Sequence, residues 1–127
     1  MTANITGSEG NLTQKIRVGV LFGGRSGEHE VSLMSARSVV RVLDTNKYAV
    51  TQIGITHDGK WLSGEDALDA LETGKTAQLT PVTLLPQAGQ RTLFAIENGV
   101  LKPLADLDVI FPVLHGTFGE DGALQGL

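Results

Sequence analysis

Residues 16–33 read IRVGVLFGGRSGEHEVSL, and this stretch decides the fold class. Residues 15–22 form a nearly continuous apolar run, which is typical of a strand buried on both faces of a sheet. A glycine-rich segment, 23–27, follows at once. Beyond it, apolar residues recur at helical spacing, and this pattern predicts an amphipathic helix that ends near Leu43. The stretch therefore predicts a strand, a glycine loop and a helix, the opening of an α/β domain.

A similar arrangement stands near the end of the sequence. Residues 108–114 contain almost no polar side chain, which predicts a second buried strand, and a second glycine loop follows over 115–122. Residues 123–127 are typical of a first helical turn. In open parallel sheets, ligands bind beyond the carboxyl ends of the strands. We therefore expect both glycine loops to lie at the ligand-binding edge of one sheet.

The middle of the sequence adds further elements. We expect, in chain order, a strand over 48–56, a turn at 57–60 that leads into Trp61, a helix over 64–72, and a hairpin with strands at 92–96 and 100–104. Ser63, with Asp66 three residues later, resembles a capping box that begins the helix. Residues 74–90 show no sustained period, so we expect an irregular insertion there. The fold class is then α/β: three layers, with a mostly parallel sheet flanked by helices and an inserted β-hairpin region.

Composition limits the number of domains and the classes of partner. A chain of 127 residues accommodates one compact core. Residues 1–14 are polar and lack the basic and apolar parts of a secretion signal, so we expect a disordered tail before a domain over 15–127. The net charge of −4, without a cluster of basic residues, argues against nucleic acid or a membrane as partner. The absence of cysteine suits the cytoplasm, which we take as the location.

Three familiar glycine-loop motifs do not fit these loops. A phosphate-binding P-loop requires a lysine that neither loop contains. Arg25 stands where a dinucleotide-binding loop would have its second glycine. Glu28 stands where a hydrolase nucleophile elbow would have its last glycine. A metal site is also disfavoured, because Glu28, His29 and Glu30 are adjacent in sequence and their side chains diverge.

The pattern that remains is a carboxylate, Glu28, at one loop and an imidazole, His115, at the other. A carboxylate suits an ammonium ion, and an imidazole can donate to a carboxylate. Helix N-termini add backbone N–H donors. Together these groups would hold a small zwitterion such as an amino acid.

Structural readings stay open for the same residues. Glu28 is also a favourable partner for a helix dipole, and His115 is also a candidate hydrogen-bonded structural residue. Ser32 is a candidate helix cap. The other polar and aromatic side chains are expected to be structural. Glu120 and Asp121 are expected in a turn. Three further side chains, Arg25, His29 and His57, are expected at the surface, and Trp61 in the core.

Residues 18–33, together with 111–116 and 119–122, resemble two motifs of the D-alanine–D-alanine ligases. The resemblance extends over 15–127 and is weakest in 74–90. It implies the Rossmann-like domain that precedes the ATP-grasp domains of an enzyme of peptidoglycan precursor synthesis. In that family, ATP phosphorylates the carboxylate of one D-alanine, and the amine of a second D-alanine attacks the acyl phosphate.

The resemblance also implies roles for individual residues. Glu28 would contact the ammonium of the first D-alanine and act in catalysis, and His115 would lie near the carboxylate of that substrate. Val31 would line the pocket, and Glu120 would support the histidine loop. The other supporting residues implied are Gly23, Gly24, Ser32 and Gly116.

The cofactors implied are ATP and Mg²⁺ or Mn²⁺, held by central and C-terminal ATP-grasp domains that this sequence lacks. We therefore expect no metal site, no bound cofactor and no catalysis in residues 1–127 alone, and a homodimer for the whole enzyme. Two alternatives remain. One is a stand-alone α/β module that binds a small ligand, and the other is a ligase that prefers D-lactate or D-serine as its second substrate.

Overall fold

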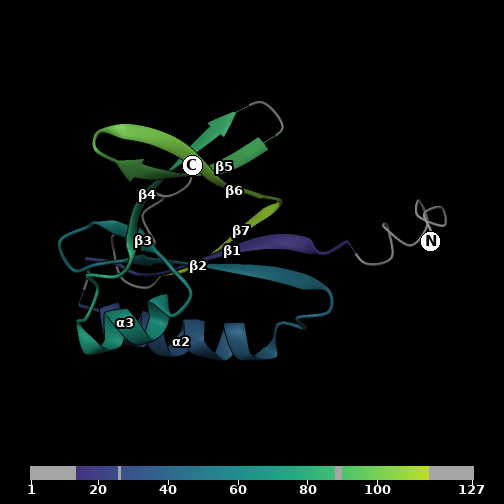
Figure 1. Cartoon of the computed structure of the whole chain (residues 1–127). Coiled ribbons are helices and arrows are strands. Elements are labelled where there is room, and N and C mark those ends of the chain that lie inside the picture. Colours follow the sequence, from purple (N-terminus) through teal and green to yellow (C-terminus); the bar gives the residue numbers. More distant parts are fainter. Residues whose placement is uncertain (1–13, 26, 88–89, 115–127) are drawn as a thin grey trace, which may run out of the picture.

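The computed structural model describes residues 14–25, 27–87 and 90–114 (Figure 1). Its elements, in chain order, are β1 (Ile16–Gly23), α2 (His29–Val42), β2 (Tyr48–Ile55), β3 (Trp61–Ser63), α3 (Ala67–Thr73), β4 (Thr80–Gln87), β5 (Gln90–Glu97), β6 (Val100–Leu107) and β7 (Val109–Val113). Neither α2 nor α3 has the length and apolar character that a membrane-crossing helix requires.

All strands belong to one sheet of seven, in the order β6-β5-β4-β3-β2-β1-β7. β1 pairs in parallel with both β2 and β7, whereas the neighbours from β2 through to β6 pair antiparallel. Figure 1 shows α2 and α3 beneath the parallel strands, with β4, β5 and β6 on the opposite side. The predicted α/β fold class is confirmed. The sheet is mixed and not mostly parallel as predicted. Its parallel part is β2-β1-β7. The hairpin region extends the same sheet through four antiparallel pairings, because most of its strands are joined by short connections, which make neighbouring strands run in opposite directions.

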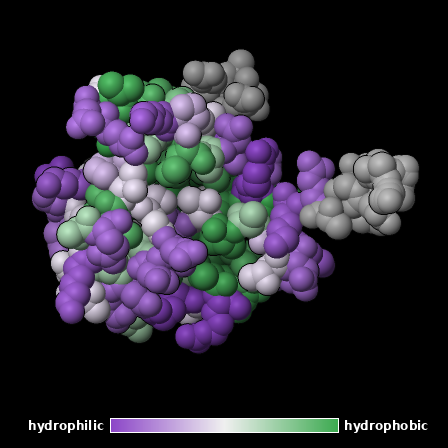
Figure 2. Space-filling model, in the orientation of Figure 1, coloured by the Kyte–Doolittle hydropathy of each residue, from purple (hydrophilic) through white to green (hydrophobic). Residues whose placement is uncertain are grey.

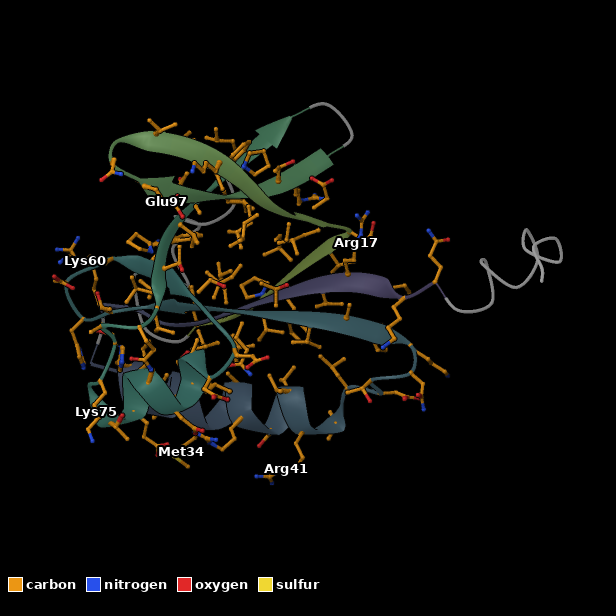
Figure 3. All side chains as sticks on the ribbon, viewed as in Figure 1. Arg17, Met34, Arg41, Lys60, Lys75 and Glu97 are labelled. Atoms are coloured by element: carbon orange, nitrogen blue, oxygen red, sulfur yellow. The ribbon has the colours of Figure 1, made fainter. Side chains whose placement is uncertain are left out.

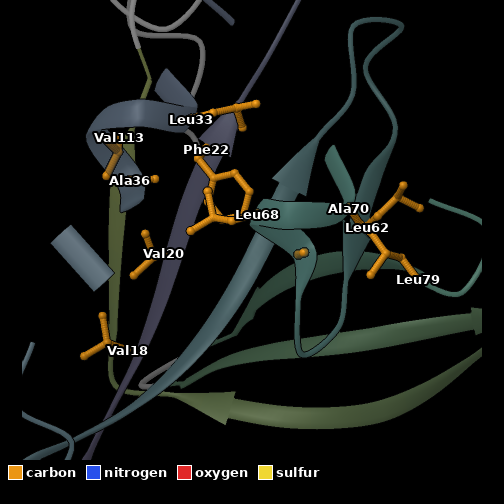
Figure 4. Packing of buried hydrophobic residues seen from close by; sticks show 11 residues of the cluster. Val18, Val20, Phe22, Leu33, Ala36, Leu62, Leu68, Ala70, Leu79 and Val113 are labelled. Atoms are coloured by element: carbon orange, nitrogen blue, oxygen red, sulfur yellow. The ribbon is translucent and has the colours of Figure 1, made fainter. Parts of the chain in front are cut away.

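β1 is buried on both faces, as its apolar run predicts. Val18, Val20 and Phe22 point toward the helices and pack in a cluster with residues of α2 and α3 (Figure 4). Leu21 belongs to a second cluster with residues of β2, β4, β5 and β6. Full burial of such a side chain stabilises the fold by about 1.5–3 kcal/mol. β1 is therefore the strand on which both halves of the core depend.

α2 packs against the core through one face and is also joined to α3 by salt bridges. Its buried residues, His29, Ser32, Leu33 and Ala36, follow the i, i+3, i+4, i+7 spacing of a helix face. On the outer side, Nη2 of Arg37 lies 2.9 Å from Oδ1 of Asp69 and 2.7 Å from Oε1 of Glu72. The helix begins and ends close to its predicted bounds.

The prediction of an irregular insertion over 74–90 is wrong in its second half. β4 is a strand of eight residues that pairs with β3 and β5, and Val82 and Leu84 are buried at alternate positions. Only these two side chains carry the alternation, which is too short a pattern to separate from a loop. Pro81 lies near the beginning of the strand, where proline is tolerated. Strand pairing therefore decides this segment.

The predicted capping box at Ser63 is also wrong. Ser63 lies in β3, and its hydroxyl donates to the carbonyl of Gln52 at 2.7 Å. α3 begins three residues later than predicted, and its N-cap, Asp66, makes no side-chain capping bond. Instead the Gln52 side chain accepts a hydrogen bond from the Leu68 N–H at 3.0 Å. A side chain of the neighbouring strand β2 therefore accepts a hydrogen bond from a backbone N–H in the first turn of this helix.

The hairpin of β5 and β6 is confirmed. Asn98 and Gly99 have φ angles of 53° and 76°, the left-handed values that a tight two-residue turn needs. Figure 2 shows apolar residues at the surface over this hairpin, at the top of the view, and Val100, Leu101 and Leu104 of β6 are exposed. The tail predicted over 1–14 lies, except for Gln14, outside the described residues.

β7 is a strand, as predicted, but it is not buried. Val109 and Phe111 are 46% and 43% exposed, and only Val113 is buried. β7 is the last strand in the sheet order and pairs with β1 alone in the described part of the chain. The apolar sequence of a strand shows which side chains could be buried. Whether they are buried depends on the position of the strand in the sheet.

Candidate functional site

The carboxyl ends of the three parallel strands lie side by side. Gly23, at the end of β1, is in register with Ile55 at the end of β2, and Phe22 is in register with Val113 at the end of β7. The segments that follow these strands therefore leave the sheet at one edge. This is the edge where parallel sheets bind ligands.

The first glycine loop turns sharply at Gly23 and Gly24, whose φ angles are 92° and 108°. The Gly24 N–H donates to the carbonyl of Ile55 at 2.8 Å and fixes the loop to the end of β2. A Cβ atom on Gly23 would lie 2.2 Å from the carbonyl oxygen of Ile55. Position 23 therefore requires glycine, both for its dihedral angle and for space.

Ser32 connects the two predicted loop regions. It is fully buried, its hydroxyl accepts a hydrogen bond from the Gly23 N–H at 2.8 Å, and it donates to the carbonyl of Val113. The hydroxyl therefore joins the end of β1 to the end of β7. It does not cap α2, because the N-cap residue of that helix is Glu28.

Glu28 and Val31 share one exposed side of the start of α2. The Glu28 carbonyl accepts the first helical hydrogen bond, from the Ser32 N–H at 2.9 Å, while its side chain is exposed and makes no capping bond. Val31, three residues later and 43% exposed, lies on the same side of the helix. The positive end of the helix dipole also lies here and makes the electrostatic potential at the start of α2 more positive.

Of the region around the second glycine loop, the structure describes the chain up to Leu114. Leu114 lies beside the first loop, since a Cβ on Gly24 would be 3.8 Å from Cδ2 of Leu114. His115, Gly116 and Glu120, which complete the predicted set, lie outside the described residues. The structure thus brings together Glu28, Val31 and the strand end that precedes His115.

His29 is a buried residue beside the candidate site whose position sequence reasoning missed. It was predicted at the surface, but it is only 3% exposed, and its Nδ1 lies 2.7 Å from the carbonyl oxygen of Gly24. Its ring stacks on that of His57, with centroids 3.8 Å apart and planes at 25°. The signal for burial was present, because His29 begins the apolar stripe of α2 at helical spacing. Arg25 and His57 are exposed, as predicted.

No group of three or more His, Cys, Asp or Glu side chains comes together within the described ranges. The glycine loop has no lysine that could reach a phosphate. What this edge of the sheet offers is a carboxylate, an exposed apolar side chain and a helix N-terminus, which suit a small molecule with an ammonium group.

Comparison with known proteins gives a consistent result. The family described as "D-ala D-ala ligase N-terminus" matches residues 17–127. A D-alanine–D-alanine ligase of Natranaerobius thermophilus is 51% identical over 114 residues, which are 89% of this chain and 31% of that protein. One from Bradyrhizobium sp. is 48% identical and is matched over 90% of this chain and 32% of its own length.

A solved structure agrees with these sequence matches. The VanG D-Ala:D-Ser ligase from Enterococcus faecalis superposes with a TM-score of 0.74 at 37% identity, covering 89% of this chain and 33% of that one. The chain thus spans about a third of the length of the relatives it matches. On the family match and the shared fold, this chain belongs to the D-alanine–D-alanine ligase N-terminal domain family.

Proposed function

We propose that this chain is the domain that binds the first D-alanine in an ATP-dependent D-alanine–D-alanine ligase. The observation that carries the proposal is the convergence of β1 and β7 at one edge of the sheet. There the buried Ser32 joins the two strand ends, and Glu28 stands exposed at the N-cap of α2. Family membership supports the same reading.

Within this reaction, the chain's own residues bind and orient substrate. The Glu28 carboxylate pairs with the ammonium of D-alanine, and Val31 contacts its methyl group. His115, from the second loop, donates a hydrogen bond to the carboxylate of the same D-alanine. In the proposed route that carboxylate is activated as an acyl phosphate, and the amine of a second D-alanine displaces phosphate to form the amide. ATP and Mg²⁺ or Mn²⁺ would be held by other domains, because the first glycine loop has no lysine for phosphate and no group of three or more His, Cys, Asp or Glu forms among the described residues.

The size of the relatives favours this proposal over a stand-alone binding module, since each matched protein is about three times as long as the stretch that it shares. The identity of the second substrate is separate. Because one similar structure is a D-Ala:D-Ser ligase, D-serine and D-lactate are the alternatives to compare with D-alanine. We also propose that the complete enzyme is a cytoplasmic homodimer, a state that light scattering of the complete enzyme would measure.

The test is Glu28→Gln in the complete protein. The substitution keeps size and removes charge, so it should weaken D-alanine binding at the first site by about 1.5–3 kcal/mol, the range for hydrogen bonds to charged groups. That loss is roughly ten- to a hundredfold in affinity. Glu30→Gln is the matched control, because Glu30 is an exposed acid two residues away in the first turn of α2. ATP affinity and thermal unfolding should change little in either variant.

Two results would contradict the proposal. One is unchanged first-site kinetics in Glu28→Gln, which would leave Glu28 as a helix-dipole partner. The other is an equal loss in Glu30→Gln, which would show that local charge near the helix matters and not a contact made by Glu28. Absence of any dipeptide from the complete protein with D-alanine, D-serine or D-lactate would favour the binding module.

A further inference from the structure

A cavity of about 670 Å³ lies beside the proposed substrate site without including it. It is bounded by the first residue of α2, the 56–60 turn, the end of α3 and the start of β4. Neither Glu28 nor Val31 lines it. The volume falls in the range of roughly 300–1,000 Å³ that is usual for small-molecule sites.

The wall of the cavity is largely apolar. The side chains that form it are Leu62, Leu71, Ala77, Leu79 and Pro81. Leu62 and Leu79 belong to the buried core, so this wall is held by packing on both sides. An apolar wall with a few polar groups is the usual composition of a site for a compact organic molecule.

The charged groups at the rim balance one another. The Thr56 hydroxyl donates to the Asp58 carboxylate and accepts from the Lys60 N–H at 3.0 Å. The first of these bonds lowers the pKa of Asp58. Nζ of Lys60 lies 3.9 Å from Oδ2 of Asp58, and Figure 3 shows Lys60 at the outer end of this turn. Arg25 also acts on Asp58, and Oε2 of Glu30 lies 3.8 Å from Nε2 of His57. Two basic and two acidic side chains therefore stand at or near the rim and give no preference for a charged ligand.

His29 supplies a buried polar group to the cavity wall. A carbonyl oxygen can only accept, so Nδ1 of His29 donates to Gly24, and in the neutral form of an imidazole with this tautomer Nε2 is an acceptor. Within the described residues Nε2 has no hydrogen-bond partner, although the residue is 3% exposed. A donor from a ligand would give this buried nitrogen a hydrogen bond.

The imidazole is also held in place before any ligand arrives. The bond to Gly24 fixes one edge of the ring, and the stacked ring of His57 covers one face. A pre-organised acceptor loses little freedom on binding. We propose that this cavity binds a small uncharged aromatic ring compound with one N–H or O–H donor, which donates to Nε2 of His29 while its ring packs against Leu62 and Leu79. This inference does not depend on the proposed ligase function.

The experiment uses indole as the probe and ¹⁵N-histidine-labelled intact protein. Indole should shift the Nε2 signal of His29 saturably, with a single site. Methylation of the indole nitrogen removes the donor and keeps the ring, so 1-methylindole should bind roughly fivefold more weakly, as expected for loss of one neutral hydrogen bond. Ala77→Phe places a ring at the exposed rim, away from the glycine loop, and should abolish the shift with both compounds.

Each contrary result overturns the proposal. No saturable shift at His29, equal affinities for indole and 1-methylindole, or full binding in a folded Ala77→Phe protein would each do so. Thermal unfolding confirms that the variant is folded, and if it is not, Pro81→Trp at the same wall replaces it. Glu28→Gln should leave indole binding unchanged, so failure here is distinguishable from failure of the proposed D-alanine site.

Discussion

The hydroxyl of Ser32 donates a hydrogen bond to the carbonyl of Val113, across 81 residues of sequence. The same oxygen accepts from the Gly23 N–H, so this buried hydroxyl both donates and accepts a hydrogen bond. The hydroxyl therefore adds a side-chain bridge between the ends of β1 and β7, which already pair as neighbouring strands. The loops that carry Glu28 and His115 start from these two strand ends.

Removal of this hydroxyl should destabilise the domain. Ser32→Ala leaves the Gly23 N–H and the Val113 carbonyl buried without a partner, so the free energy of unfolding should fall by about 1–3 kcal/mol. Urea unfolding measures the change. Ser38→Ala is the control on the same helix, since the Ser38 hydroxyl is exposed and contacts the Met34 carbonyl at 3.5 Å. Equal losses for the two variants would show that the bridge contributes nothing of its own.

Substitution of Gly23 should be far more damaging than substitution of Gly27. A Cβ on Gly23 would press on the Ile55 carbonyl at a φ of 92°, which predicts a loss of roughly 2–5 kcal/mol from the combined strain and overpacking. A Cβ on Gly27 meets nothing within 4 Å, so Gly27→Ala should change stability by less than about 1 kcal/mol. Thermal unfolding of both variants tests the pair. A Gly23→Ala domain as stable as Gly27→Ala would disprove the steric argument.

Acid should weaken the link between β1 and β7 at their amino ends. Arg17 of β1, labelled in Figure 3, donates to both carboxylate oxygens of Asp108, which also accepts from the Arg17 backbone N–H. These hydrogen bonds lower the pKa of Asp108 from 3.8 to about 2. A carboxyl with a lowered pKa stabilises the fold above its ordinary pKa, and this contribution is lost as the pH falls from about 4 through about 2.

The pH prediction is tested with Asp108→Asn. The variant should be less stable than the parent at pH 7, and the difference should shrink as the pH falls through that window, because protonation removes the same charge from the parent. Added salt should reduce the effect, since both side chains are partly exposed. Urea unfolding across the pH range gives the curve. A difference that stays constant from pH 7 down to pH 2 would reject the assignment to Asp108.

Residues 1–127 alone should show no specific affinity for ATP. The first glycine loop has no lysine for phosphate, and no metal-binding group forms among the described residues. Isothermal titration with ATP and Mg²⁺ should give only the heat of dilution, whereas the complete protein should give a saturable isotherm. Stoichiometric, saturable binding to residues 1–127 would contradict the assignment of ATP to other domains.

Much of this protein follows from its sequence because the deciding signals are local. The apolar run of β1, the helical spacing of α2 and the Asn98-Gly99 turn each specify an element with residues adjacent in the chain. Glu28 was predicted as a site residue in the same way, since a carboxylate directly after a glycine loop and at a helix start is visible without a structure. The family likeness rests on the same local motifs.

Tertiary structure decided what depends on neighbours distant in sequence. β4 is a strand because β3 and β5 pair with it, and Ser63 is a strand residue because Gln52 accepts its hydrogen bond. β7 is half exposed because it stands at the edge of the described sheet. The sequence predicted His29 as a surface residue and Ser32 as a helix cap, but the fold buries both side chains near the strand ends. Burial and hydrogen-bond partners are properties of the assembled sheet, so no stretch of sequence specifies them alone.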